Sequence, residues 1–116
     1  MDNRKLGIGS FAYRYEAGIP GFMPVTPMTP QEFIEVAATK LGLKRIQLCE
    51  NIKYADQDEK TMAAMVKRTR ELDLAVELGM YGATEENLRK HIRLAQLFQA
   101  LWLILTATAT NCFRPT

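Results

Sequence analysis

Four short apolar segments, separated by three stretches with helical periodicity, constrain the fold of this chain more than any other feature. The segments are Leu6–Ile8, Arg45–Cys49, Leu74–Leu78 and Leu101–Leu105. Such alternation is typical of a parallel sheet whose strands are joined by crossover helices. A closed barrel of eight such units needs about 250 residues, whereas this chain has 116. The pattern therefore predicts an α/β fold with four parallel strands, a truncated barrel that corresponds to half of the closed one.

The stretches between the apolar segments carry helix starts. Residues 29–32 (Thr-Pro-Gln-Glu) combine a capping threonine, a proline suited to the first helical position and a glutamate that can complete a capping box. The second helix is expected to begin near Asp56 or Asp58, and the third at Thr84. Helical spacing predicts two buried faces: Phe33, Ala37 and Leu41 in the first helix, and Leu88, Ile92, Ala95 and Phe98 in the third.

Composition and charge narrow the class of protein. With 47% hydrophobic and 24% charged residues, the chain resembles an ordinary globular domain, expected over residues 1–105 with an irregular tail over 106–116. A net charge of +2 with dispersed basic residues argues against nucleic-acid binding. The longest apolar run, near 97–105, is too short to cross a membrane. Two cysteines without metal-ligand spacing, and no apolar leader, predict a reduced cytoplasmic protein.

The first candidate binding residues follow the first strand. A long loop, residues 11–28, opens at the carboxyl end of that strand, where parallel α/β folds place their sites. Tyr13 and Tyr15 are two residues apart, so both rings could form walls for a sugar or another polyol. Anchoring of the loop explains this pair equally well. Gly7 and Gly9 lack a phosphate-loop spacing and are interpreted as positions where strands pack closely.

Polar residues also end the second strand and interrupt the third. Glu50 and Asn51 follow the second strand directly, and a carboxylate beside an amide suits the binding of substrate hydroxyls. Turn formation by Asn51 is an equally good interpretation. Glu77 lies within the third strand, where a buried carboxylate must be paired or take part in chemistry. A lysine or arginine from the missing half of a barrel could be its partner.

The single histidine gives little support for catalysis. His91 falls in the middle of the third helix, which would lie outside a barrel, so a surface or partly packed position is expected. One histidine without an acidic cluster cannot complete a metal site. Cys49 would act as a nucleophile only beside a basic partner, and no Ser/His/Asp or Cys/His set is evident. The residues therefore identify neither a catalytic group nor a metal ligand.

Several segments taken together resemble one known family. They are GIGSFAYRY over 7–15, PMTPQEF over 27–33, RIQLCEN over 45–51 and AVELGMYG over 75–82, which is followed by a TEENL helix start. Their order and spacing resemble the N-terminal half of sugar phosphate isomerase/epimerase proteins, which belong to the xylose isomerase-like TIM barrel superfamily. The resemblance covers about residues 5–105. Each motif alone is weak, and the order of all of them carries the resemblance.

The resemblance implies metal-assisted proton transfer on a sugar or polyol, with Mn²⁺ or Mg²⁺ holding the substrate oxygens. In isomerase and epimerase members, the main metal-binding acids and the ligating histidine come from later strands, which have no counterpart here. Tyr13, Glu50, Asn51 and Glu77 match family positions, which implies substrate-pocket or supporting roles for them. This chain alone is therefore expected to hold no metal and to be inactive, as a truncated, frame-shifted or fragmentary form of a longer barrel.

Two alternatives stay open. Two copies, each giving four strands, could dimerise and form a pocket across their interface, although they would supply no histidine at a strand end. The chain could also be a small open α/β ligand-binding module of flavodoxin-like layout that uses the Tyr13 loop to hold its ligand. As a half-barrel, the chain is expected to self-associate or to be short-lived, because open sheet edges and uncovered inner faces are association sites.

Overall fold

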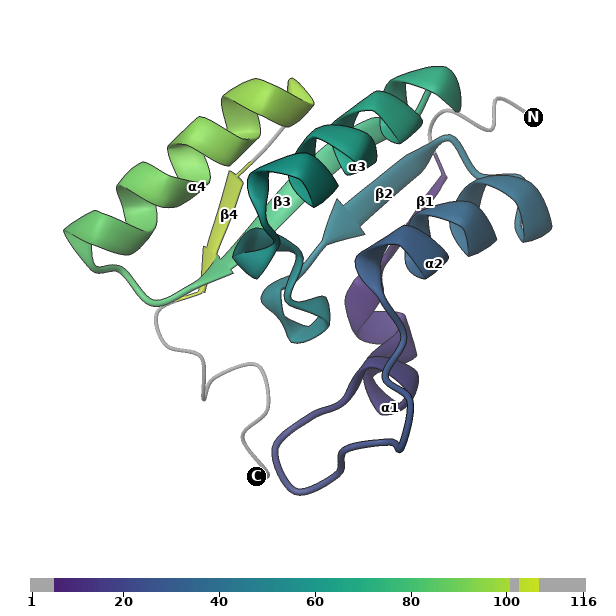
Figure 1. Cartoon of the computed structure of the whole chain (residues 1–116), viewed down its shortest axis with the longest axis horizontal. Helices are drawn as coiled ribbons and strands as arrows, with labels where there is room; N and C mark the ends of the chain where they lie inside the picture. Colours follow the sequence, from purple (N-terminus) through teal and green to yellow (C-terminus); the bar gives the residue numbers. More distant parts are fainter. Residues whose placement is uncertain (1–5, 101–102, 107–116) are drawn as a thin grey trace.

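The computed structural model describes residues 6–100 and 103–106 as an α/β unit with one four-stranded sheet (Figure 1). All strands are parallel and pair in sequence order, β1-β2-β3-β4. Their bounds are β1 Gly7–Gly9, β2 Arg45–Leu48, β3 Ala75–Tyr81 and β4 Leu103–Thr106. The predicted α/β class with four parallel strands is confirmed. The expectations for the N-terminal leader, for Cys112 and for the tail after residue 106 lie outside the described residues.

Three helical crossovers lie side by side over one face of the sheet (Figure 1). An ion pair between Arg68 and Glu35 joins the second helix to the first, and Arg70 Nη2 donates to Leu97 O of the third at 3.1 Å. The crossovers are α2 (Pro30–Glu35) continuing into the π-helical turn η3 (Val36–Lys40), α3 (Glu59–Glu71) and α4 (Glu85–Phe98). Among the described helices, none is long and apolar enough to span a lipid bilayer.

The helix starts are those that the sequence predicts. Thr29 and Glu32 form a complete capping box before α2, with the Glu32 amide donating to Thr29 Oγ1 at 3.1 Å. Asp58 accepts from the Thr61 amide at 2.7 Å in front of α3, and Thr84 caps α4. The loops after β1 and β2 are not fully irregular, because they contain short helical turns: η2 (Ser10–Tyr13), α1 (Arg14–Ala17), η4 (Glu50–Ile52) and η5 (Tyr54–Asp56).

The core lies between the sheet and the helical layer. Alternate residues of β2 and β3 face the helices and are at most 1% exposed: Ile46, Leu48, Val76, Leu78 and Met80. The helices contribute Phe33, Ile34, Met65 and Leu94 to the same cluster. The opposite face of the sheet has no helix from the described residues on it (Figure 1), and it carries the intervening side chains, including Arg45, Gln47 and Glu77.

Two predicted helix faces differ from the structure. Leu94 and Phe98 are buried in α4 together with His91, whereas Leu88 and Ile92 are 40% and 44% exposed. The predicted face is rotated because a histidine, which an apolar pattern does not count, occupies the central inward position. In the first helix, Phe33 and Ala37 are buried as predicted, but Leu41 is exposed.

β1 packs tightly against β2 because its positions on the helix-free face are glycines. A Cβ atom on Gly7 would lie 2.8 Å from Arg45 O and 2.9 Å from Arg45 Cβ. On Gly9 it would lie 3.2 Å from Gln47 Oε1. The side chains of β2 therefore occupy the space beside β1, and the predicted role of both glycines in close strand packing is confirmed.

Three of the four strands start at the same level of the sheet. Gly7, at the start of β1, is level with Arg45 and through it with Ala75. β4 begins at Leu103, which is level with Leu78. The start of β4 is therefore offset by three residues from the starts of the other strands.

Candidate functional site

A buried hydrogen-bond clamp joins the carboxyl ends of β1 and β2. Ser10 Oγ donates to Asn51 Oδ1 at 2.8 Å and accepts from the Cys49 amide at 2.9 Å. Asn51 Nδ2 donates to Ser10 O at 3.1 Å. Ser10 is fully buried and Asn51 is 6% exposed. The Asn51 amide thus holds η4 against η2, and one of its N–H groups and one oxygen lone pair remain for other partners.

Glu50 joins β2 to β3 and to α4. One carboxylate oxygen accepts from the Tyr81 amide, and the other lies 3.0 Å from His91 Nε2. His91 Nδ1 lies 2.9 Å from Asn87 O. A carbonyl oxygen can only accept, so Nδ1 carries the hydrogen that it donates to Asn87 O. Nε2 then faces the Glu50 carboxylate at ion-pair distance.

The predicted surface or partly packed position of His91 is wrong. Helix α4 lies outside the sheet as expected, but His91 points inward and is fully buried. Its ring meets Tyr54 edge-on, with centroids 6.0 Å apart. Tyr54 is also fully buried and donates to Gly79 O at 2.9 Å. Burial, and next the nearby Glu50 carboxylate, raise the pKa of the Tyr54 phenol far above its usual range.

The two tyrosines of the first loop face different partners. Tyr13 is partly buried and packs edge-on against Phe33 of α2, with ring centroids 6.0 Å apart. Tyr15 is 54% exposed, lies 5.9 Å from the Phe22 ring and carries the Arg14 guanidinium 4.9 Å from its centroid. These contacts favour the anchoring interpretation for Tyr13. Tyr15 stays accessible on the loop, away from Tyr13.

Glu77 lies on the helix-free face of the sheet, level with Gln47. Its carboxylate is 3.8 Å from Arg45 Nη1, and the two side chains are 19% and 35% exposed. Its ionic partner therefore comes from the neighbouring strand β2 of the same chain. The sequence-based suggestion of a partner from another half of a barrel is therefore not needed: Arg45 lies on the same face as Glu77, two residues before its level partner Gln47, and its long side chain spans that offset.

A cleft of about 510 Å³ opens at the carboxyl ends of β2 and β3. One wall is the loop 18–23, whose side chains are mostly apolar, and the other contains Glu50, Asn51, Lys53 and Tyr81. Lys53 supplies the basic group among these lining residues. Its backbone is left-handed, with φ of 55°, a conformation that is uncommon for a residue with a side chain and that clusters at functional sites.

The cleft contains two of the five predicted site residues, Glu50 and Asn51. Tyr13, Tyr15 and Glu77 lie outside its walls. Sequence reasoning missed Lys53 because a lysine in a turn carries no distinctive pattern. The available signal was its position three residues after Glu50, in the segment that follows a strand end.

The divalent metal that the sequence resemblance implies does not fit the described residues. Within residues 6–100 and 103–106, no three His, Cys, Asp or Glu side chains gather closely enough to hold an ion. The Glu50 carboxylate, the acid among the residues that line the cleft, already has one oxygen engaged by the Tyr81 amide and the other by His91. No chemical step is therefore assigned here through a metal.

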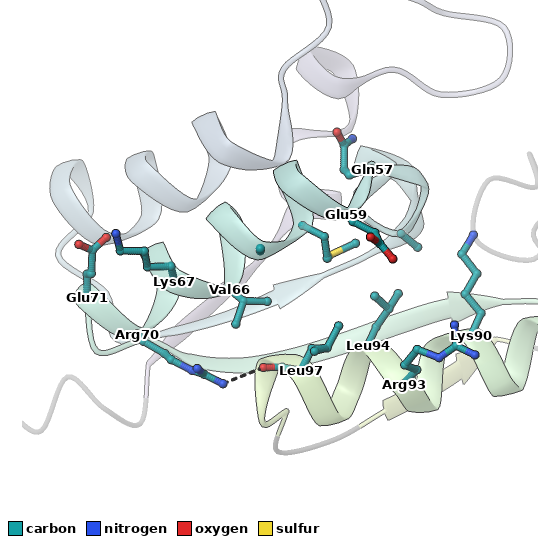
Figure 2. Close-up of a pocket in the computed structure, with 13 residues that line it drawn as sticks. Gln57, Glu59, Val66, Lys67, Arg70, Glu71, Lys90, Arg93, Leu94 and Leu97 are labelled. Atoms are coloured by element: carbon teal, nitrogen blue, oxygen red, sulfur yellow. Dashed lines mark hydrogen bonds between the residues drawn. The ribbon is translucent and has the colours of Figure 1, made fainter.

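A larger hollow of about 740 Å³ lies between α3 and α4, on the outer side of the helical layer (Figure 2). It shares no lining residue with the cleft at the strand ends. Ligand sites of open parallel sheets lie outside the carboxyl ends of the strands. We therefore take the smaller cleft as the candidate ligand site and treat the groove between the helices separately.

Comparisons with family models, with curated proteins and with solved structures each find no match to this chain. What the described residues establish is a small α/β domain with four parallel strands. The likeness to one family rests on the sequence motifs alone.

Proposed function

We propose that this chain is a half-barrel of the sugar phosphate isomerase/epimerase type, within the xylose isomerase-like superfamily, and that its cleft binds a phosphorylated sugar or polyol. The observation that carries this proposal is the position of the cleft at the carboxyl ends of β2 and β3, beside strands that pair in sequence order. Barrels of strand–helix units place their sites at that end of the sheet.

The chemistry of the cleft supports a polar, anionic ligand. The Lys53 ammonium can pair with a phosphate, and the free hydrogen-bonding capacity of Asn51 can engage sugar hydroxyls. The apolar loop 18–23 offers a surface for the C–H face of a sugar ring. A volume of about 510 Å³ lies within the usual range of small-molecule sites.

Catalysis is not assigned to this chain. A general base must reach the proton that it removes, yet both oxygens of Glu50 are engaged by Tyr81 and His91. In this proposal, the isomerase or epimerase reaction and its Mn²⁺ or Mg²⁺ belong to the intact family barrel. The present residues bind and orient the ligand.

The sheet order argues against a flavodoxin-like binding module. Doubly wound sheets place later strands on both sides of the first one, as in the order 2-1-3-4-5, and cover both sheet faces with helices. Here β1 lies at an edge and the strands follow in sequence. The helices lie on one face (Figure 1). This is the arrangement of one continuous winding direction, as in a barrel.

Closure of two copies into a symmetrical barrel is also disfavoured. Inward side chains of a barrel form layers from alternate strands. The helix-free face, which would form that interior, carries Gly7 and Gly9 on β1 and Gly79 on β3. Two copies would bring two sets of these three glycines into one interior and leave voids, which natural cores avoid.

The proposal is tested by titrating the protein with glucose 6-phosphate and with glucose, using amide chemical shifts to follow binding. We expect the phosphorylated sugar to bind about tenfold more tightly or better, since a charge-assisted contact with Lys53 contributes about 1.5–3 kcal/mol. Lys53→Gln should remove that preference and leave the weak binding of glucose unchanged.

The matched control is Lys60→Gln, which makes the same change at an exposed position of α3 outside the cleft. It should retain the full preference for the phosphorylated sugar. Equal binding of both sugars by the unmodified protein, or equal loss in the two variants, would contradict the proposal.

A further inference from the structure

The groove between α3 and α4 has an apolar floor built from both helices and the turn before α3 (Figure 2). Its floor residues are Ala55, Met62, Ala63, Val66, Leu94 and Leu97. Leu97 is 45% exposed, and the small side chains of Ala55 and Ala63 leave the groove open along α3. A polar ligand would find few partners on this floor, so an occupant must present apolar groups.

Basic side chains line both walls of the groove. Lys67 and Arg70 come from α3, and Lys90 and Arg93 from α4. Two of them are engaged: Arg70 donates to Leu97 O at 3.1 Å, and Lys90 pairs with Asp56 at 2.9 Å. Within the described residues, neither Lys67 nor Arg93 forms an ion pair. Each wall therefore carries one basic side chain that forms no ion pair with the described residues.

Acidic groups on the rim do not cancel this charge. Glu59 lies toward one end of the groove and Glu71 toward the other (Figure 2). Glu71 is within 3.9 Å of Arg68, which lies outside the groove. Lys67 extends toward the end where Glu71 lies, and Arg93 stands on α4 (Figure 2). The lining as a whole has four basic side chains against these two acidic ones, an excess that favours an occupant with carboxylates.

We infer that this groove binds an amphipathic helix of a partner protein, with an apolar stripe against the floor and acidic residues along both flanks. The walls are helices of 13 and 14 residues, about 20 Å long, which matches a helix laid along them. A small ligand is disfavoured, because such ligands bury most of their surface and this groove is open along its length (Figure 2). Helix-in-groove recognition needs an elongated apolar floor of this kind.

A second copy of this chain does not supply the matching helix. The exposed apolar stripe of α4 consists of Leu88 and Ile92. The flanking Glu85 is already paired with Arg89 at 2.8 Å, so the stripe presents no free acidic flank on that side. The partner that the charges fit is therefore another protein.

The test uses two synthetic helical peptides of 14 residues, the length of α4. Both carry the same leucine stripe; one has glutamate and the other lysine on its flanks. Binding to the full chain is followed by fluorescence anisotropy and mapped by amide chemical shifts. We expect the acidic peptide to bind about tenfold more tightly or better, to shift the amides of Ala63, Val66 and Leu94, and to weaken with added salt.

Lys67→Glu combined with Arg93→Glu should weaken the acidic peptide about tenfold or more. The control combines Lys40→Glu with Lys60→Glu, the same change in net charge at exposed positions outside the groove. Thermal melts show that each variant is folded. Equal affinity for the two peptides, shifts outside the groove, equal loss in the control, or no binding of either peptide at about 1 mM would each overturn the inference.

Discussion

At the residue scale, the pair of Glu50 and His91 holds the carboxyl ends of two strands and a helix together. Glu50 follows the end of β2. Its carboxylate accepts a hydrogen bond from the amide of Tyr81, the last residue of β3, and lies 3.0 Å from His91 Nε2 on α4. The contact with Tyr81 satisfies a backbone amide, and the contact with His91 places the carboxylate beside a buried ring nitrogen. His91, which is 41 positions away in the sequence, thus helps to fix the wall of the cleft that contains Glu50.

His91→Ala should therefore destabilise the protein strongly. It leaves the Glu50 carboxylate, which is 18% exposed, without the imidazole beside it and opens a cavity next to Tyr54. Removing one partner of a buried pair costs about 3–5 kcal/mol. Urea unfolding followed by circular dichroism measures the change. The control, Arg89→Ala, breaks an exposed pair on the same helix and should cost less than about 1 kcal/mol. Similar midpoints for the two variants would contradict the assigned role.

Sequence reasoning reached the location of the candidate site but not its composition. The strand-end positions of Glu50 and Asn51 follow from topology alone, because parallel strands end at one edge of the sheet. The contribution of Lys53 depends on a left-handed backbone at that residue, which no pattern of residue types specifies. His91 was missed because an apolar periodicity ignores polar residues that are buried through a distant partner.

At the element scale, the helical layer is held by polar contacts as well as by its apolar faces. Glu35 of α2 accepts from both Nε and Nη2 of Arg68 on α3, a fork-like arrangement that suits a guanidinium and a carboxylate. The hydrogen bonds from Arg68 lower the pKa of Glu35 below its usual value of 4.5. This pair therefore makes the packing of α2 on α3 sensitive to acid.

Because the pKa of Glu35 is lower in the folded than in the unfolded chain, its ionised form stabilises the fold above about pH 4.5. That contribution is lost as the pH falls through the folded value. Glu35→Gln should therefore lower the unfolding midpoint in urea at pH 7 and have little effect in acid. The difference should be small and shrink with salt, since both side chains are 41% exposed.

A double-mutant cycle isolates this contact. In an Arg68→Gln background, Glu35→Gln should have almost no further effect at any pH, because its partner is already gone. An equal effect with and without Arg68, or a Glu35→Gln effect that grows in acid, would mean that the pair does not set the pH dependence.

Helix starts were predictable, whereas helix faces were only partly so. Caps at Thr29, Asp58 and Thr84 are local signals, read from a few neighbouring residues. The face of the first helix depends on its geometry. The π-helical turn over Val36–Lys40 holds more residues per turn than an α-helix, so Leu41 no longer aligns with Phe33 and is 45% exposed.

At the scale of the whole molecule, the helix-free face of the sheet separates this fold from one with both faces covered. Ile104 of β4 lies on that face, level with Gly79, and is 43% exposed. Among the described strands, β4 pairs on one side only. An apolar side chain on an edge strand favours association between chains.

Ile104→Lys should therefore reduce self-association, which light scattering measures as a fall in average mass at a fixed protein concentration. A lysine on an edge strand opposes pairing with another strand. Val25→Lys is the control, since Val25 is fully exposed in the first loop, away from the sheet. A fall of equal size in the control would show that added charge alone is responsible, and a monomeric unmodified protein would contradict the prediction.

The offset of β4 has a further consequence for the sheet. Within the described strands, β2 pairs with residues 75–78 of β3 and β4 pairs with residues 78–81, so Leu78 alone has partners on both sides. β3 thus links two pairs of strands that overlap by one residue. Its hydrogen bonds to β4 can therefore open locally while those to β2 stay closed.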